Sequence, residues 1–219
     1  MDGEALRARR EQRDRILEAA LAHVAFDGWS DRALRAGADD AGIDRATARR
    51  LFPQGGDSLL AWLDDWADRK MLEACPAEEL QRLPVRRRIA RLVRARLEAL
   101  APHREAVRRA LAARGLPGNW LEAGKAFWTT LDRIWQAVGL PPEADSGLDY
   151  YTRRATLAAV LLSTTLFWLE DESEGCRATW AFLDRRIEDA LNIGRFAGRL
   201  RGFVSWIPGL GGLGRPARE

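Results

Sequence analysis

Few side chains in this sequence have the types and spacings that support covalent or metal chemistry. The cysteines Cys75 and Cys176 are far apart and match no metal-binding or redox spacing. The histidines His23 and His103 form no Glu-x-x-His pair of the kind that helical di-iron sites use. No catalytic pairing of two carboxylates, of Ser with His or of Cys with His is recognisable, and the tail sequence GLGGLG follows no predicted strand. We therefore predict no catalytic residues, no metal ion, no cofactor and no enzymatic activity.

Aromatic side chains are abundant instead, with nine tryptophans among 219 residues. They recur with other apolar residues at helical spacings over residues 120–135 and 157–168. Ordinary core packing is an alternative for each of them, but large rings leave voids, and apolar voids bind apolar ligands. We expect a bound isoprenoid lipid or phospholipid along this wall. The predicted lipid-binding residues are Trp120, Phe127, Trp128, Leu131, Trp135, Leu157, Leu161, Thr164, Phe167 and Trp168.

A second chemical feature is an amphipathic stretch near the C-terminus, residues 195–208. Its apolar residues follow Phe196 at steps of four, three, one and three, which makes one stripe on a helix. The stretch contains three arginines and no acidic residue, a composition typical of a helix at a membrane interface with its arginines on anionic head groups. A last helix packed on the protein's own body is the alternative. The predicted membrane-binding residues are Arg195, Phe196, Arg199, Leu200, Phe203, Val204, Trp206 and Ile207.

The elements that must position these residues are all helices. Alternation of apolar and polar residues is absent, and alanine, leucine and arginine, which favour helix, dominate the sequence. We expect Gly28 to end the first helix and Ser30 and Asp44 to be the N-caps of the next two. About nine helices are predicted before the amphipathic stretch: 6–26 or 11–26, short ones after Ser30 and Asp44, then 57–75, 84–101, 102–115, 120–138, 149–171 and 175–194.

Residues 11–52 have the order helix, helix, glycine turn and short helix, which is the pattern of a helix-turn-helix. ILEAALAHVAFDGWS, the AGID turn at Gly42 and the terminal Leu51-Phe52 resemble the N-terminal domain of TetR-type regulators, whose larger helical body holds a small-molecule pocket. Residues 31–52 contain five arginines and four aspartates, so their net positive charge is small. Affinity for DNA depends on the number of phosphates that a protein neutralises. We do not expect DNA binding, but Arg49 and Arg50 leave it open, and a ligand-responsive transcriptional repressor is the alternative function.

Two longer stretches carry a more specific resemblance. DYYTRRATLAAVLLSTTLFWLEDES and TWAFLDRRIEDALNIGR are similar to coenzyme Q biosynthesis protein nine, a TetR-like family of ubiquinone biosynthesis. The resemblance extends back through RLEALAPHREAVRRALA and FPQGG, and Tyr151-Thr152-Arg153-Arg154 followed by Leu157-Ala158-Ala159 is its most specific element. It implies a non-catalytic dimer that holds lipid in its body and associates with membrane through a C-terminal amphipathic helix. It also implies that this dimer presents precursor to the di-iron demethoxyubiquinone hydroxylase.

The same resemblance implies a patch for this partner at the start of the eighth helix, where Tyr stands at position 150 in place of the family's Trp. Aromatic and arginine side chains are also enriched at interface hot spots. The alternative is a structural role, with Tyr151 half-buried and Arg154 paired to an acid such as Asp149 or Glu188. The predicted partner-binding residues are Tyr150, Tyr151, Arg153 and Arg154.

Four regions follow from these patterns: a helix-turn-helix-like head (1–56), a helical lipid-binding and dimerisation body (57–194), an amphipathic membrane helix (195–208) and a disordered tail (209–219). The first fifteen residues, MDGEALRARREQRDR, contain interspersed acids and no apolar run, which predicts a cytosolic bacterial protein. The apolar run Leu157–Leu169 is too short to cross a bilayer. We expect an all-α, TetR-like homodimer that is cytoplasmic and peripheral on the inner face of the bacterial membrane.

Overall fold

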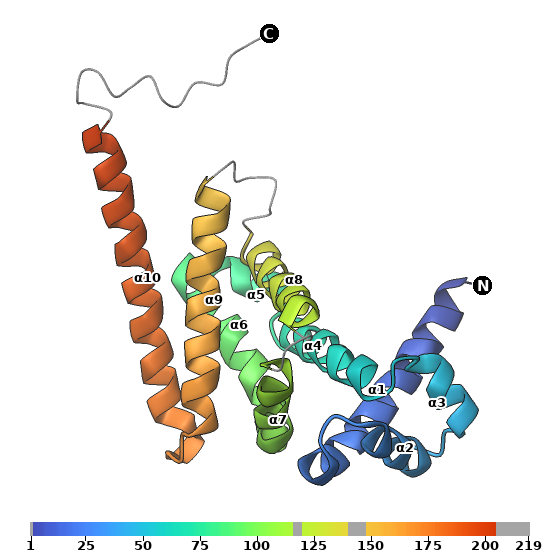
Figure 1. The fold of residues 1–219 in the computed structure, drawn as a ribbon. Coiled ribbons are helices and arrows are strands. Elements are labelled where there is room, and N and C mark those ends of the chain that lie inside the picture. Colours follow the sequence, from blue (N-terminus) through green and yellow to red (C-terminus); the bar gives the residue numbers. More distant parts are fainter. Residues whose placement is uncertain (1, 116–119, 140–147, 205–219) are drawn as a thin grey trace.

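The computed structural model describes residues 2–115, 120–139 and 148–204, and for residues 2, 120–123, 148–153 and 191–204 it describes the backbone alone. Within these ranges every regular element is a helix (Figure 1). The predicted all-α fold class is confirmed.

Three helices form the N-terminal head. The Ser30 hydroxyl accepts a hydrogen bond from a backbone N–H in the first turn of the second helix at 3.3 Å. The Asp44 carboxylate accepts from Ala46 N and Thr47 N at 3.0 and 2.9 Å. Gly42 has φ +66°, the left-handed conformation that the turn before the third helix requires. The head therefore has the predicted order and the two predicted N-caps, and its helices are α1 (Asp2–Asp27), α2 (Asp31–Asp40) and α3 (Arg45–Leu51).

The remaining described helices form the body. The predicted helix over 120–138 is present with those bounds, and a short helix between residues 75 and 84, which was not predicted, joins α4 to α6. Pro102 lies in a 3-10 turn rather than at the start of the next α-helix. The body elements are α4 (Gly56–Glu73), α5 (Ala77–Gln81), α6 (Val85–Leu100), η1 (Ala101–His103), α7 (Arg104–Arg114), α8 (Trp120–Val138), α9 (Leu148–Leu169), η3 (Glu174–Cys176) and α10 (Arg177–Val204).

The last helix differs most from its prediction. We predict a break near residue 194 and a separate amphipathic helix after it, but α10 continues without interruption from Arg177 to Val204. An interior glycine costs a helix roughly 1 kcal/mol relative to alanine and does not by itself end it. The separate helix is therefore wrong as an element boundary, and residues 205–219 lie outside the described residues.

Helix α4 occupies the centre of the molecule. It packs against α1 and α2 of the head and against α6 and α8 of the body. The pair α9 and α10 lies on the side of the body away from the head (Figure 1). Since α9 has 22 residues and its antiparallel partner has 28, the C-terminal end of α10 extends beyond the start of α9.

Candidate ligand-binding cavity

A cavity of about 250 Å³ lies inside the body where α4, α6, α7, α8 and α9 meet. On α7 its lining residues recur every three or four positions, so that one face of this helix forms a wall. Leu162 on α9 is 44 % exposed, and the cavity therefore opens beside this helix. The apolar side chains that line it are Leu63, Leu100, Val107, Ala110, Leu111, Phe127, Leu161 and Leu162.

One end of the cavity is charged. Asp64 on α4 accepts hydrogen bonds from Arg96 Nη2 at 3.1 Å and from Arg114 on α7. Arg96 is 8 % exposed and also donates through Nε to Asp68 at 2.9 Å. Burial alone would lower the pKa of Arg96, but the carboxylates of Asp68 and Asp64 raise it above its usual value. The cavity thus joins an apolar wall to a charged end, which is the arrangement of a site for an amphiphile.

The ion pairs continue from the cavity into the head. Arg133 on α8 lies 3.1 Å from Asp68 and 2.7 Å from Asp65. Arg69 then lies 2.9 Å from Asp65 and 2.6 Å from Asp14 on α1. Carboxylates and guanidinium groups alternate along the whole path, which we call the Asp–Arg series. Its members in order are Asp14, Arg69, Asp65, Arg133, Asp68, Arg96, Asp64 and Arg114.

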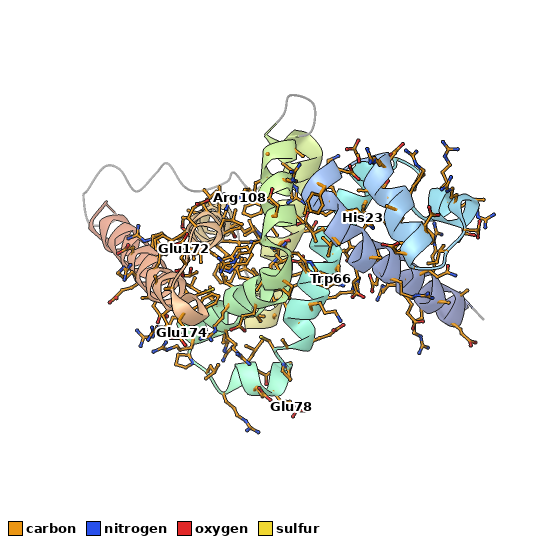
Figure 2. All side chains as sticks on the ribbon, turned by 90° about the horizontal axis from the view of Figure 1, so that it is seen from below. His23, Trp66, Glu78, Arg108, Glu172 and Glu174 are labelled. Carbon is orange, nitrogen blue, oxygen red and sulfur yellow. The ribbon has the colours of Figure 1, made fainter. Side chains whose placement is uncertain are left out.

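Three tryptophans add hydrogen bonds across the junction of head and body. Trp29 Nε1 donates to a backbone carbonyl of α7 at 3.1 Å, Trp62 Nε1 to Asp14 at 2.8 Å, and Trp66 Nε1 to Glu18 at 3.0 Å. Figure 2 shows Trp66 between α1 and α4. The head is therefore held against the helix that also lines the cavity.

The predicted lipid-binding residues occupy three environments. Phe127 and Leu161 line the cavity. Trp128 and Phe167 are 36 % and 38 % exposed, and the side chain of Trp120 lies outside the described residues. The remaining residues pack in the core and do not line the cavity, which agrees with the alternative of ordinary core packing. They are Leu131, Trp135, Leu157, Thr164 and Trp168.

The charged end of the cavity is missing from the predicted site, although the sequence carries a signal for it. Asp64 and Asp68 are four residues apart on α4 and fall at the same helical spacing as the buried Leu60, Leu63 and Ala67. Carboxylates inside an apolar stripe need buried partners. No spacing within one helix, however, identifies those partners, which come from α6, α7 and α8.

Of the predicted partner-binding patch, only Arg154 has a described side chain. It is 1 % exposed, and its Nε donates to Asp132 Oδ1 on α8 at 2.7 Å. This corrects the assignment of Arg154 to the partner-binding patch and agrees with the structural alternative for this residue: α9 packs on α8, and the Arg154 side chain is buried there with an acid. Among the described side chains, the acid that it contacts is Asp132; of the two acids considered from the sequence, Asp149 has a side chain outside the described residues. The side chains of Tyr150, Tyr151 and Arg153 lie outside the described residues.

The predicted membrane-binding residues lie at the C-terminal end of the chain. Positions 195–204 are on the helical backbone of α10, whose side chains there are not described, and Trp206 and Ile207 lie outside the described residues. None of the described helices combines the length and the apolar character needed to span a membrane. Within the described side chains, no three His, Cys, Asp or Glu residues are grouped so as to hold a metal ion.

A wide groove of about 510 Å³ lies between α9 and α10, close to the turn that joins them. Phe167 and Phe182 stack in it with ring centroids 4.6 Å apart and an interplanar angle of 8°. Beside them, Leu166 is 51 % exposed. This outer face of the helix pair is therefore apolar and accessible in the single chain.

Comparison with known proteins gives consistent matches. A family model described as COQ9 matches residues 121–194, which cover α8, α9 and the first part of α10. The human protein named ubiquinone biosynthesis protein COQ9, mitochondrial, is 30 % identical over 196 residues, 85 % of this chain and 60 % of its own length. The protein of the same name from Drosophila melanogaster is 30 % identical over 189 residues, 83 % of this chain and 56 % of its own length. The chain thus spans about 60 % of the length of these relatives.

A solved structure shares the fold. The crystal structure of a TetR transcriptional regulator from Nitrosomonas europaea matches with a TM-score of 0.66 and 25 % sequence identity, covering 82 % of this chain and 97 % of the regulator. The TetR-like fold and the resemblance drawn from the sequence are confirmed together: the chain is a relative of the COQ9 proteins.

Proposed function

We propose that this chain serves ubiquinone biosynthesis as a non-catalytic accessory protein. It holds an isoprenoid lipid in the cavity, docks on the inner face of a bacterial membrane and presents a precursor to demethoxyubiquinone hydroxylase. The name of its relatives supports the pathway, and the cavity is the observation that carries the lipid-binding role. The segment that matches the family model contributes Phe127 and Leu161 to the cavity wall.

The lining of the cavity suits an aliphatic chain. Cavities of about 150 Å³ lined by aliphatic and aromatic residues stay dry and bind small apolar molecules. At about 250 Å³ this one accommodates more than such a molecule but less than a whole prenyl lipid. The rest of a long chain would leave beside Leu162, where the cavity opens.

The amount of lipid that co-purifies with the chain tests the lipid-binding role. Replacing Ala110, which is 1 % exposed and lines the cavity, by Phe fills it from within. Prenyl lipid or phospholipid should be extracted from the purified wild-type chain and largely lost from Ala110→Phe. Ala112→Phe makes the same change on the exposed side of α7 and should keep the lipid. Mass spectrometry that finds no such lipid in the wild type would contradict the proposal.

The membrane role rests on the end of α10. Since the sequence of residues 195–204 contains three arginines and no acid, and its apolar positions share one helical face, it suits an interface with anionic lipid. Deleting residues from Phe196 onward should abolish sedimentation with anionic vesicles while leaving the helical circular-dichroism signal of the remaining chain. Equal sedimentation of the truncated and intact chains would remove this part of the proposal.

A ligand-responsive repressor is the second candidate, and the TetR structural neighbour favours it. Against it, Arg45 in the third helix of the head is held by Asp39 at 3.0 Å, and Arg32 lies 3.3 Å from Asp27, so part of the positive charge is already neutralised. A gel-retardation assay with genomic fragments at physiological salt separates the two. Tight, sequence-dependent retardation would favour the repressor.

A further inference from the structure

We propose that the cavity recognises the head of its ligand as well as its chain. Arg114, held beside Asp64, forms a subsite for an anionic oxygen of the head group, such as a carboxylate, phenolate or phosphate oxygen. The inference rests on the proposed lipid-binding function and adds the chemical class and the orientation of the ligand.

The first support is the change from apolar to charged side chains along α7. Val107, Ala110 and Leu111 line the cavity with apolar side chains, and Arg114 follows on the same face as its last member. The Arg114 side chain is 22 % exposed, so its guanidinium is accessible from the cavity. An amphiphile would therefore lie with its chain against Val107 and its head at Arg114.

The second support is the sign of the charge. The Asp–Arg series begins with the carboxylate of Asp14 in the head and ends with the guanidinium of Arg114 at the cavity. Among its members that line the cavity are Arg96 and Arg114 but only one carboxylate, that of Asp64. Arg96 is also bound by Asp68, so the group that the Asp–Arg series presents at its cavity end is the guanidinium of Arg114. Charge interactions are stronger beside an apolar interior than in water.

The third support is the chemistry of the donor. A guanidinium has five N–H donors in a fixed fork and no acceptor, so the group that complements it must accept hydrogen bonds. Charge-assisted hydrogen bonds to anionic oxygens are roughly twice as strong as neutral ones. In the part of the chain that the structure describes, Arg114 is partnered by Asp64, which also binds Arg96. An anionic oxygen of the ligand beside Arg114 would therefore be the next negative group after Arg114 in the Asp–Arg series.

A purely structural role for Arg114 makes a different prediction, and two probes with the same alkyl chain distinguish the roles. Decanoate carries an anionic head and 1-decanol a neutral one, and at about pH 8 the carboxylate is ionised. Isothermal titration calorimetry of the full chain should give an affinity for decanoate at least about tenfold higher than for 1-decanol, since a hydrogen bond to a charged group is worth roughly this much. A structural role predicts no preference for decanoate, because a carboxylate that enters an apolar cavity without a partner loses its hydration.

Substitutions of Arg114 test whether this side chain is the source of the preference for decanoate. Arg114→Gln should weaken decanoate binding by about tenfold and leave 1-decanol within about twofold. Arg114→Lys should keep most of the preference. Arg109→Gln is the matched control, because Arg109 lies on the same helix, is paired with Glu105 at 3.1 Å and does not line the cavity. Asp64 keeps Arg96 as a partner in each variant, so the fold should be retained.

Each outcome decides the matter. A wild-type affinity for decanoate no higher than that for 1-decanol, or a preference for decanoate that survives in Arg114→Gln, would overturn the head-group subsite and leave lipid binding intact. Binding of neither probe by the wild-type chain would overturn the subsite together with the proposed lipid-binding function.

Discussion

Arg96 carries its positive charge in the interior of the body, between Asp64 and Asp68 of α4. The hydroxyl of Thr130 also donates to Asp68, at 2.9 Å, so both carboxylates have several partners. A buried pair of this kind need not add stability relative to apolar residues, but removal of one partner leaves uncompensated charge. The residue is therefore a sensitive probe of the Asp–Arg series.

Replacing Arg96 by Met should lower the free energy of unfolding by about 3–5 kcal/mol, because two buried carboxylates lose a common partner. Urea denaturation followed by circular dichroism measures the loss. The control is Arg91→Met on the exposed side of the same helix, which should change stability by no more than about 0.5 kcal/mol. A loss below about 1 kcal/mol for Arg96→Met would show that water or rearranged partners satisfy the carboxylates, contrary to the structure.

Asp171 stabilises the turn between α9 and α10 through hydrogen bonds. Its carboxylate accepts hydrogen bonds from Ser173 N and Thr179 N, both at 2.8 Å, and from the Thr179 hydroxyl at 2.5 Å. Burial alone would raise the pKa of Asp171, but the hydrogen bonds from Ser173 and Thr179 hold it well below its usual range. A depressed pKa stabilises the fold above the unfolded-state pKa of about 4, and this contribution is lost as the pH falls below it.

The variant Asp171→Asn should therefore be less stable than wild type at pH 7 and should approach it as the pH falls below about 4. Thermal unfolding of both proteins over this pH series gives the difference directly. A difference that stays constant down to the lowest accessible pH would mean that the ionised carboxylate is not what stabilises the turn.

At the scale of elements, local signals predicted the helices well where capping residues and apolar spacing agree. Ser30 and Asp44 mark the starts of α2 and α3, and the α8 bounds follow from Trp120 and the glycine after Val138. The short α5 was missed because five residues between prolines give too few turns for a periodic pattern. The continuous α10 does not follow from local signals, because Gly194, Gly198 and Gly202 each disfavour helix while the helix continues through them.

Tertiary contact explains another feature that local propensity does not: the glycine within α2. A Cβ atom at Gly37 would lie 2.5 Å from Ala20 Cβ and 2.7 Å from Ala20 N on α1. Alanine favours helix by about 1 kcal/mol over glycine, but the clash should cost about 1–3 kcal/mol, since backbone must move. The close approach of α1 and α2 therefore determines this position.

Gly37→Ala should accordingly be destabilising, while Gly124→Ala in α8, where a Cβ meets nothing within 4 Å, should be neutral or stabilising by up to about 1 kcal/mol. Guanidinium denaturation of the two variants compares identical substitutions with opposite expected signs. Stabilisation by Gly37→Ala would mean that α1 and α2 can separate at little cost.

At the scale of the whole molecule, the sequence predicted the head, the helical body and part of the cavity wall. Phe127 and Leu161 are found from helical periodicity because they lie on apolar faces. Arg114 and its partners are not, because the series joins α1, α4, α6, α7 and α8, and the distances between different helices are absent from any local pattern. Arg154 shows the same limit: the side of α9 that packs on α8 depends on the tertiary fold.

The exposed face of α9 and α10 should pair with a second copy of the chain as a four-helix bundle. Leu166→Glu should convert the dimer to a monomer of 24.6 kDa, because a carboxylate at its centre would be buried without a partner. Multi-angle light scattering after gel filtration gives the mass. Leu72→Glu, at a 37 % exposed position on α4, should leave the dimer unchanged. A monomeric wild type would contradict this assignment.

Photoaffinity labelling with a prenyl lipid that carries a diazirine on its chain tests the central claim most directly, because it reports where the lipid lies. Peptide mapping should find the label on the α7 and α8 segments that line the cavity, around Val107 and Phe127, and Ala110→Phe should reduce it. Labelling confined to the outer groove around Phe167, with no loss in Ala110→Phe, would contradict the account.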